Sequence, residues 1–209
     1  QINSFQKKTE KKVELLIKNK IVWLAASTHK NEEKFALNIH KKLKEKKEFK
    51  NLLTIIVPRN VKRAVKIKKD LKKEISTTNL FSSKKNLNYS EIIIDDSIGQ
   101  LNLWYKKIKT VFLGKSYPPL GGQNPIEPAK YGCTIITGEM SNFKEIQKEM
   151  TGCKSILIGN NFKEFHSLIS DSLNKKNYIK KVQKKAKSYV KSKNFILEKT
   201  INKIDRYLV

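Results

Sequence analysis

Short apolar runs alternate along the chain with segments whose apolar residues recur at helical spacing. The runs predict strands at Ile21–Ser27, Leu52–Pro58, Glu91–Asp95, Thr110–Gly114, Cys133–Thr137 and Lys154–Ile158, with a weaker strand at Thr78–Ser82. Because strands and helices take turns, successive strands need crossover connections, which favour a parallel sheet with helices on both faces. We therefore expect an α/β fold with a Rossmann-like parallel sheet.

Three segments outside the strands have an amphipathic helical pattern. Glu32–Lys46 and Asn161–Leu173 each place apolar side chains on one side of a helix, and we interpret both stripes as faces packed on the core. Thr9–Lys20 predicts a helix that leads into the first strand.

The C-terminal part of the chain carries no strand signal. Leu197, Ile201, Ile204 and Leu208 follow a spacing of i, i+4, i+7 and i+11, which predicts a packed C-terminal helix. Lysine dominates Asn177–Lys193, and apolar residues are sparse there. That segment is either a surface helix or a mobile connector.

The length of the chain, 209 residues, suits one α/β domain and is too short for two large ones. We expect a single domain over Gln1–Val209. No apolar stretch approaches the roughly 20 residues that cross a bilayer, and Gln1–Glu10 lacks the basic and then apolar pattern of a signal peptide. These features predict a cytoplasmic protein.

The two cysteines, Cys133 and Cys153, form no CxxC pair and are not grouped with the three histidines. A disulfide framework or a structural zinc site is therefore not expected, nor is a metal or other cofactor. Both cysteines are predicted to be buried thiols at strand starts.

The net charge of +26, from 45 basic and 19 acidic residues, would ordinarily suggest nucleic acid. Only Arg59, Arg63 and Arg206 are arginine, however, and phosphate clamps and groove readers favour the planar guanidinium. A solvated lysine surface is the main interpretation, with attraction to an anionic membrane as its functional consequence. A basic module that binds nucleic acid or other anions remains the alternative.

The segment Leu113–Gly132, LGKSYPPLGGQNPIEPAKYG, leaves a strand, turns at prolines and glycines, and enters a short helix at Asn124 with Pro125 in the first turn. Such a helix start exposes backbone N–H groups and the positive end of a dipole, which favours a phosphate. Glu127, one turn into the helix, either holds the two hydroxyls of a ribose or complements the helix dipole.

Arg59 and Arg63 follow the run that ends at Val57-Pro58. Ligands of open parallel sheets bind at the carboxyl ends of strands, so Arg59 is expected to point toward a crevice. Pairing of a strand-end arginine with a surface carboxylate is the alternative.

Two further strand ends carry polar or glycine residues. Asp95–Leu101 is a strand-to-helix transition, with Gly99 at a position where the backbone approaches something closely. Ala25–His29 ends the first strand with small residues and hydroxyls, and His29 is either a partner of the helix start or an active-site donor. All these segments fall at one edge of the predicted sheet.

Taken in order, the segments AASTHKNEE, VPRNVKR, DDSIGQL, LGKSYPPLGGQNPIEPAKYG and ITGEMSNF resemble the C-terminal half of the 3-deoxy-D-manno-octulosonic acid (Kdo) transferases of lipid A assembly. The resemblance covers Ile21–Phe143 strongly and the remainder loosely. Its most specific element is GG-x-NP-x-EP.

The resemblance implies the C-terminal half of a two-domain, inverting, metal-independent glycosyltransferase of the GT-B type. The implied donor is CMP-Kdo and the acceptor is a lipid A precursor. The general base, the acceptor site and the membrane contact belong to an N-terminal domain that this chain lacks, so no catalytic residue is expected here. The full-length protein is expected to be peripheral on the cytoplasmic face of the inner membrane.

The resemblance also implies a donor site at the strand ends. Its residues are Pro58, Arg59, Ile98 and Gly99 around the cytidine, Glu127 at the ribose, Gly122 and Asn124 at the phosphate, and Ser27, Thr28 and Ser116 near the Kdo unit.

The chain departs from the family pattern at several positions of this site. Asn60 and Gln123 stand where the family has His, Ile98 and Gln100 where it has Met and Glu, and Lys115 where it has Gly. These departures concern donor selectivity. A GT-B domain for another nucleotide sugar and a non-catalytic partner protein are therefore kept as alternatives.

Overall fold

The computed structural model describes residues 4–205, which contain one seven-stranded parallel sheet with the order β3-β4-β2-β1-β5-β6-β7. Its strands are β1 (Ile21–Thr28), β2 (Leu52–Pro58), β3 (Thr78–Leu80), β4 (Ile92–Ile94), β5 (Thr110–Leu113), β6 (Thr134–Thr137) and β7 (Ile156–Ile158). All seven predicted strands are present, with ends that differ by a few residues at most. The predicted α/β fold with a Rossmann-like parallel sheet is confirmed.

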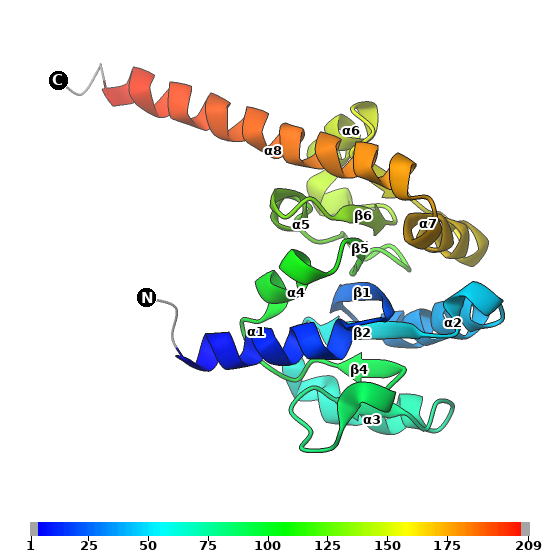
Figure 1. Cartoon of the computed structure of the whole chain (residues 1–209). Coiled ribbons are helices and arrows are strands. Elements are labelled where there is room, and N and C mark those ends of the chain that lie inside the picture. The colour runs from blue at the N-terminus through cyan, green and yellow to red at the C-terminus, as the bar shows by residue number, and fades with distance from the viewer. Residues whose placement is uncertain (1–3, 206–209) are drawn as a thin grey trace.

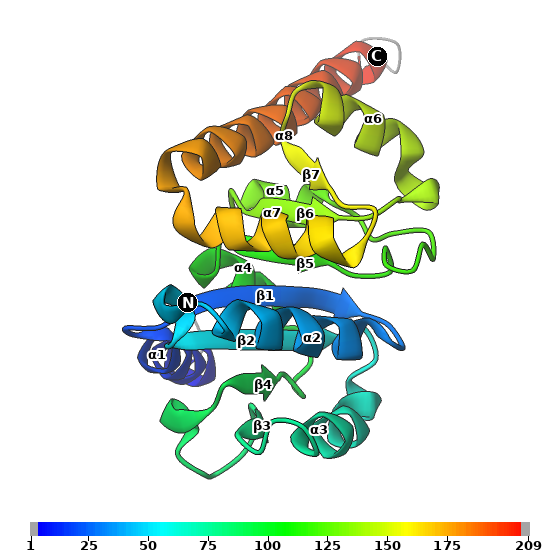
Figure 2. The same ribbon diagram turned by 90° about the vertical axis from the view of Figure 1, so that its right-hand side faces the viewer.

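Helices cover both faces of the sheet, as Figures 1 and 2 show. One face carries α2 (Glu32–Lys44), α3 (Ala64–Lys72) and α7 (Phe162–Asn174). The other carries α1 (Ser4–Ile17), α4 (Leu101–Lys107), α5 (Ile126–Lys130) and α8 (Lys176–Asp205), with α6 (Lys144–Gly152) beside β7. Single 3₁₀ turns lie at Lys47–Phe49, Val61–Arg63, Leu87–Tyr89 and Ser141–Phe143.

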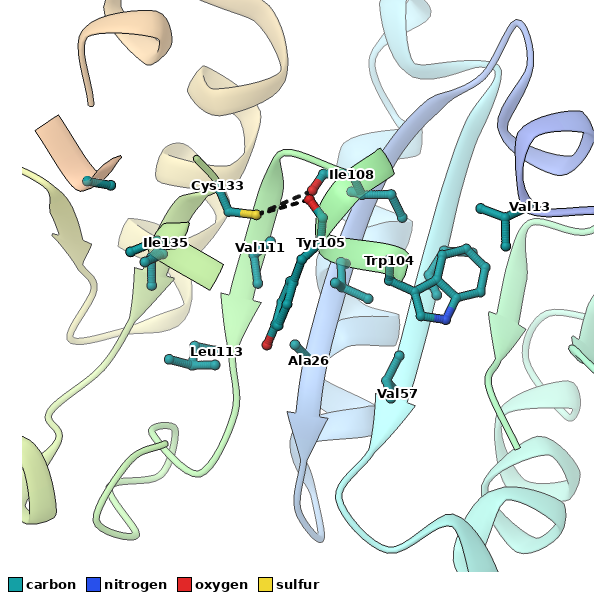
Figure 3. Packing of buried hydrophobic residues seen from close by; sticks show 14 of the residues in the cluster. Val13, Ala26, Val57, Trp104, Tyr105, Ile108, Val111, Leu113, Cys133 and Ile135 are labelled. Atoms are coloured by element: carbon teal, nitrogen blue, oxygen red, sulfur yellow. Dashed lines mark hydrogen bonds between the residues drawn. The ribbon is translucent and has the colours of Figure 1, made fainter. Parts of the chain in front are cut away.

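Each face has its own hydrophobic core because the central strands are buried on both sides; every residue of β2, for example, is buried. On the α2 face, the Phe35 ring lies 5.2 Å from the rings of both Phe112 and Phe165, measured between centroids. On the α4 face, Trp104 and Tyr105 are 0% and 1% exposed (Figure 3). Both aromatic residues therefore belong to the core of this face.

The two cysteines differ in their environment. Cys133 is buried against the carbonyl oxygens of Tyr105 and Ile108, each 3.5 Å from its sulfur, and burial raises the pKa of its thiol to about 12 (Figure 3). The prediction of a buried thiol was wrong for Cys153, which is exposed. Cys153 caps the C-terminus of α6, so it lies on the turn before β7 and not inside the sheet.

The lysine-rich segment Asn177–Lys193 is a surface helix and not a connector, which confirms the first of the two predicted forms. It forms the first part of α8, and one side of this helix is buried against the domain through Ile179, Val182, Ala186, Tyr189 and Val190. The apolar stripe from Leu197 to Leu208 lies outside the residues whose side chains are described. Within the described residues, no helix is long and apolar enough to cross a membrane.

A buried histidine links α2 to β2. His40 is 1% exposed, and its Nδ1 lies 2.8 Å from the Thr54 hydroxyl, while its Nε2 is buried without a partner. Burial penalises the charged imidazole and lowers the pKa of His40 from 6.5 to about 4.

This lowered pKa predicts acid sensitivity. Because the unfolded chain binds the proton more readily than the native one, stability that is complete above pH 6.5 is lost as the pH falls toward 4, by at most about 3 kcal/mol. Urea unfolding across this pH range measures the loss. In His40→Gln the dependence should be smaller by that amount; equal slopes in the two proteins would show that His40 does not cause it.

Candidate functional site

The carboxyl ends of four adjacent strands meet at one edge of the sheet. β4, β2, β1 and β5 are neighbours in that order, so the segments that follow them form one continuous rim. The chain winds in one direction from β1 to β2 and in the other from β5 to β6, which makes the β1/β5 boundary the topological switch point. The expected convergence of the strand-end segments is confirmed.

At the switch point, a buried carboxylate holds the loops after β1 and β5 together. Glu32 Oε2 accepts from the backbone N–H groups of His29 and Lys115, each at 2.8 Å. Its Oε1 accepts from those of Ser116 (2.9 Å) and Tyr117 (3.1 Å). With 0% exposure, Glu32 is an internal anion in a cradle of four N–H donors.

The next residue, Glu33, joins the end of β1 to the segment after β2. Its Oε1 accepts from the Thr28 hydroxyl at 3.0 Å, and its Oε2 pairs with Arg63 Nη2 at 3.0 Å. The pairing of a strand-end arginine with a carboxylate therefore applies to Arg63. The carboxylate is almost completely buried, with the Glu33 side chain 5% exposed.

Two of the hydroxyls predicted to line the crevice, those of Thr28 and Ser116, are buried and hydrogen-bonded inside the protein. Thr28 and Ser116 are both 0% exposed, and the Ser116 hydroxyl donates to the Leu113 carbonyl at 2.6 Å. The prediction that they line the crevice is corrected, because both hydroxyls hydrogen-bond within the loops. Ser27 differs: it is half-buried at a bulge between β1 and β2, with a φ of 53°.

The segment after β5 that contains Gly121 and Gly122, called here the glycine loop, is hydrogen-bonded to the backbone of Lys115. The Lys115 carbonyl accepts from Gly122 N–H at 2.7 Å and from Leu120 N–H at 3.2 Å. Gly122 has a φ of 76°, and a Cβ there would lie 2.5 Å from Met140 Cβ. The expected hydrogen bond from Gly122 to a phosphate is corrected, because this N–H already has an acceptor. Among the described residues, the N–H groups of Gln123 and Asn124 have none.

The short helix α5 begins at Ile126, and its N-cap position is Pro125 and not the predicted Asn124. The Asn124 Oδ1 accepts from Ile126 N–H at 2.9 Å. Glu127 is exposed and forms no hydrogen bond or ion pair with any described residue. Burial, together with the charge of Glu127, raises the pKa of Tyr105. The Tyr105 hydroxyl points toward the carboxyl ends of β1 and β5 (Figure 3).

The loop after β4 is tied down by Asp95. Its Oδ1 accepts from Ser97 N–H at 2.9 Å and its Oδ2 from Trp104 Nε1 at 2.6 Å. Burial raises the pKa of Asp95, against the opposite effect of these hydrogen bonds. Ile98 is left 83% exposed on this loop. The close approach expected at Gly99 was wrong: nothing lies within 4 Å of a Cβ built there, and the residue instead serves a turn with a φ of 79°.

Arg59 extends from the end of β2 without a side-chain partner among the described residues. Its backbone N–H donates to the Thr28 carbonyl at 3.0 Å, which fixes it beside β1, and the side chain is exposed. The preceding Pro58 is buried as the last residue of β2. Arg59 is thus a cation available to a ligand at this rim.

A contact between His29 and Gln123 was not predicted. His29 Nε2 lies 3.1 Å from Gln123 Nε2, which joins the loop after β1 to the glycine loop. The sequence left His29 undecided between a helix-start partner and an active-site donor. Its backbone does serve the start of α2 through Glu32, while its ring faces the glycine loop.

A hollow of about 810 Å³ lies between α1 and the segments after β3 and β4. Its lining is apolar and basic and includes Leu15, Phe81, Ile98, Lys8, Lys11, Lys12 and Lys85. Of the residues predicted for the donor site, Ile98 alone lines this hollow. The hollow therefore touches the predicted donor site only at Ile98.

Comparison with known proteins finds similar sequences among the 3-deoxy-D-manno-octulosonic acid (Kdo) transferases. No protein-family model matches the sequence. The 3-deoxy-D-manno-octulosonic acid transferase of Haemophilus influenzae is 35% identical over 138 residues, 65% of this chain and 32% of the relative. That of Rickettsia conorii is 27% identical over 205 residues, 94% of this chain and 43% of the relative. The chain is a homologue of the Kdo transferases. It spans less than half the length of these two relatives.

Solved structures agree on the fold. The C-terminal CMP-Kdo binding domain of WaaA from Acinetobacter baumannii matches with a TM-score of 0.77 and 23% identity, over 88% of this chain and 96% of that one. A UDP-forming trehalose-phosphate synthase from Burkholderia xenovorans matches with a TM-score of 0.58 and 8% identity, over 90% of this chain and 43% of that one. These matches show that the chain shares the fold of that C-terminal domain, in agreement with the predicted fold class.

One departure from the Kdo transferase pattern has a backbone explanation. Lys115 stands where the family has Gly, and its φ is 62°. This left-handed conformation favours glycine and costs other residues roughly 1–2 kcal/mol. The hydrogen bonds of the Lys115 peptide to Glu32 and Gly122 hold it in place.

The two strand-end arginines predict different effects on stability. Arg63→Ala leaves the buried Glu33 carboxylate without its cation and should lower the free energy of unfolding by about 1–3 kcal/mol. Arg59→Ala removes an exposed side chain without a partner and should change it by less than about 0.5 kcal/mol. Urea denaturation measures both, and an equal loss in the two variants would contradict the assignment.

Proposed function

We propose that this chain is the donor-binding part of a Kdo transferase and binds CMP-Kdo. The observation that carries the proposal is the division of polar groups at the rim. Glu32 binds backbone N–H groups of two rim loops and Glu33 pairs with Arg63, whereas Arg59 and Glu127 are exposed and have no side-chain partner among the described residues. Homology to the Kdo transferases supports the same donor.

Each exposed group has a role in this proposal. Arg59 and Ile98 flank the cytidine, together with Pro58 and Gly99. The Glu127 carboxylate accepts hydrogen bonds from the two ribose hydroxyls. The N–H groups of Gln123 and Asn124, beside the start of α5, bind the phosphate of CMP, and Ser27 faces the Kdo unit.

The proposed reaction is inverting and metal-independent. The transferred carbon passes through an oxocarbenium-like state as its bond to the CMP phosphate breaks. This part of the enzyme stabilises the charge that accumulates on the departing phosphate, through fixed N–H groups that need no reorganisation. In this proposal, the general base and the site for the lipid A precursor belong to an N-terminal domain of the full-length enzyme.

Glu127 gives the sharpest test of the donor site. If the carboxylate holds the ribose, Glu127→Gln should weaken CMP binding about tenfold or more, since hydrogen bonds to a charged group contribute roughly 1.5–3 kcal/mol. Isothermal calorimetry measures the affinity. The melting temperature should change little, because the exposed Glu127 side chain has no hydrogen-bond or ion-pair partner among the described residues.

Two controls separate ribose binding from a dipole effect. Glu145→Gln removes another exposed glutamate from the first turn of a helix, α6, and should leave CMP affinity unchanged. The nucleotide 2′,3′-dideoxy-CMP has no hydroxyls for the carboxylate and should bind wild type and Glu127→Gln alike. Equal CMP affinity in wild type and Glu127→Gln would refute the ribose contact, and tighter binding of UMP or UDP than of CMP would favour another donor.

We also propose that the full-length protein is peripheral on the cytoplasmic face of the inner membrane, with its lysine surface attracted to anionic lipid. Each lysine close to such a surface contributes about 1 kcal/mol at low salt. The chain should therefore cosediment with vesicles containing phosphatidylglycerol, detach as salt is raised, and ignore pure phosphatidylcholine. A sequence-specific DNA or RNA complex that survives high salt would favour the nucleic-acid alternative instead.

A further inference from the structure

The Glu32 carboxylate occupies a place where many doubly wound proteins bind a phosphate. Converging backbone N–H groups at a switch point form an anion site. Here four such groups, from His29, Lys115, Ser116 and Tyr117, already bind the two oxygens of one buried side chain. A ligand phosphate is therefore excluded from this cradle and must bind elsewhere on the rim.

The cradle is built closely around this internal anion. A Cβ on Gly114 would lie 2.9 Å from Glu32 Oε2 and 2.5 Å from the Ser27 carbonyl oxygen. A Cβ on Gly138 would lie 2.1 Å from the Ser116 carbonyl oxygen. The loops after β1, β5 and β6 thus approach one another so closely around Glu32 that only glycine fits at these two positions.

Two connections lead from Glu32 to the glycine loop. The Lys115 N–H donates to Glu32 at 2.8 Å. The Lys115 carbonyl accepts from the Gly122 N–H at 2.7 Å. His29 donates its N–H to Glu32, and its ring contacts the Gln123 amide at 3.1 Å. Both ends of the Gly122-Gln123 segment are therefore anchored to residues that Glu32 holds.

We propose that Glu32 is a positioning residue for the donor phosphate. By filling the switch-point cradle, it directs the phosphate to the neighbouring N–H groups of Gln123 and Asn124 and fixes the loop that presents them. This inference rests on the proposed function, because the phosphate is that of CMP. It assigns to donor binding a residue, Glu32, that does not itself contact the donor.

A carboxamide cannot replace this carboxylate. Both Glu32 oxygens accept two N–H groups each, whereas glutamine offers one oxygen and one NH₂ group, which is a donor only. In Glu32→Gln, two of the four backbone N–H groups therefore face another donor. The loop after β5 should loosen on that side, and Gly122 should lose its fixed acceptor.

The first measurement needs no ligand. Amide hydrogen exchange followed by NMR should show protected N–H groups at residues 29 and 115–117 in wild type, with at least two of them exchanging about tenfold faster or more in Glu32→Gln. The matched control is Glu33→Gln, which alters the adjacent buried carboxylate but no bond to the loop after β5. Unchanged protection in Glu32→Gln would overturn the proposal.

The second measurement separates positioning of the phosphate from general stability. Glu32→Gln should weaken CMP binding about tenfold or more while cytidine, which lacks the phosphate, changes less than about twofold. Glu33→Gln, at comparable stability, should not change the ratio of the two affinities. An equal loss for CMP and cytidine in Glu32→Gln would make its role merely structural and contradict the proposal.

A rescue experiment covers the case in which Glu32→Gln does not fold. Glu32→Ala empties the cradle, and formate supplies a carboxylate of matching size. Formate should raise the melting temperature and restore the amide protection of Glu32→Ala at concentrations that leave wild type unaffected, and chloride should not. No rescue would overturn the cradle as an anion site.

Failure of the proposed function gives a different pattern of results. Wild type that binds neither CMP nor cytidine would refute the donor assignment and, with it, the role of Glu32 toward a phosphate. Amide exchange and formate rescue would then still report whether Glu32 holds the loop. If wild type binds CMP but Glu32→Gln leaves the ratio of CMP affinity to cytidine affinity unchanged, only the positioning role is refuted.

Discussion

The rim of the sheet depends on one buried carboxylate and the four backbone N–H groups that bind it. Removing a carboxylate from water costs several kcal/mol unless it is paired or hydrogen-bonded. Glu32 meets that condition by drawing the loops after β1 and β5 onto its two oxygens. The glycines at 114 and 138 follow from the same constraint, because a side chain at either position would collide with backbone oxygen atoms of the loops drawn together there.

Around this anchor, the polar residues at the strand ends divide into two groups. One group is buried and satisfied inside the loops: Thr28 and Arg63 through Glu33, Ser116 through Leu113, and Asp95 through Ser97 and Trp104. The other group, which includes Arg59 and Glu127, is exposed and unpaired in the described chain. The first group gives the rim its shape, and the second gives it the capacity to bind a charged ligand.

The surplus of lysine contributes little to the fold. The ion pairs between side chains that are both mostly exposed, such as Lys42 with Glu45 and Lys175 with Asp171, lie on helix surfaces where each contributes roughly 0–1 kcal/mol at most. The pair of Glu33 with Arg63 differs, because the Glu33 side chain is only 5% exposed. Stability rests instead on the two apolar cores and on the buried carboxylates.

The sequence by itself determined the α/β class, the parallel strands and the edge at which polar segments gather. Apolar runs and helical spacing are local signals, and carboxyl ends of parallel strands must share an edge. Only the tertiary structure decided which polar residues at that edge form hydrogen bonds or ion pairs inside the protein. Glu32 binds N–H groups 83 to 85 residues away, and nothing local in the sequence distinguishes it from an ordinary first-turn glutamate. The hydroxyls of Thr28 and Ser116 were misplaced for the same reason, because a hydrogen-bond partner chosen by the folded chain leaves no periodic pattern in the sequence.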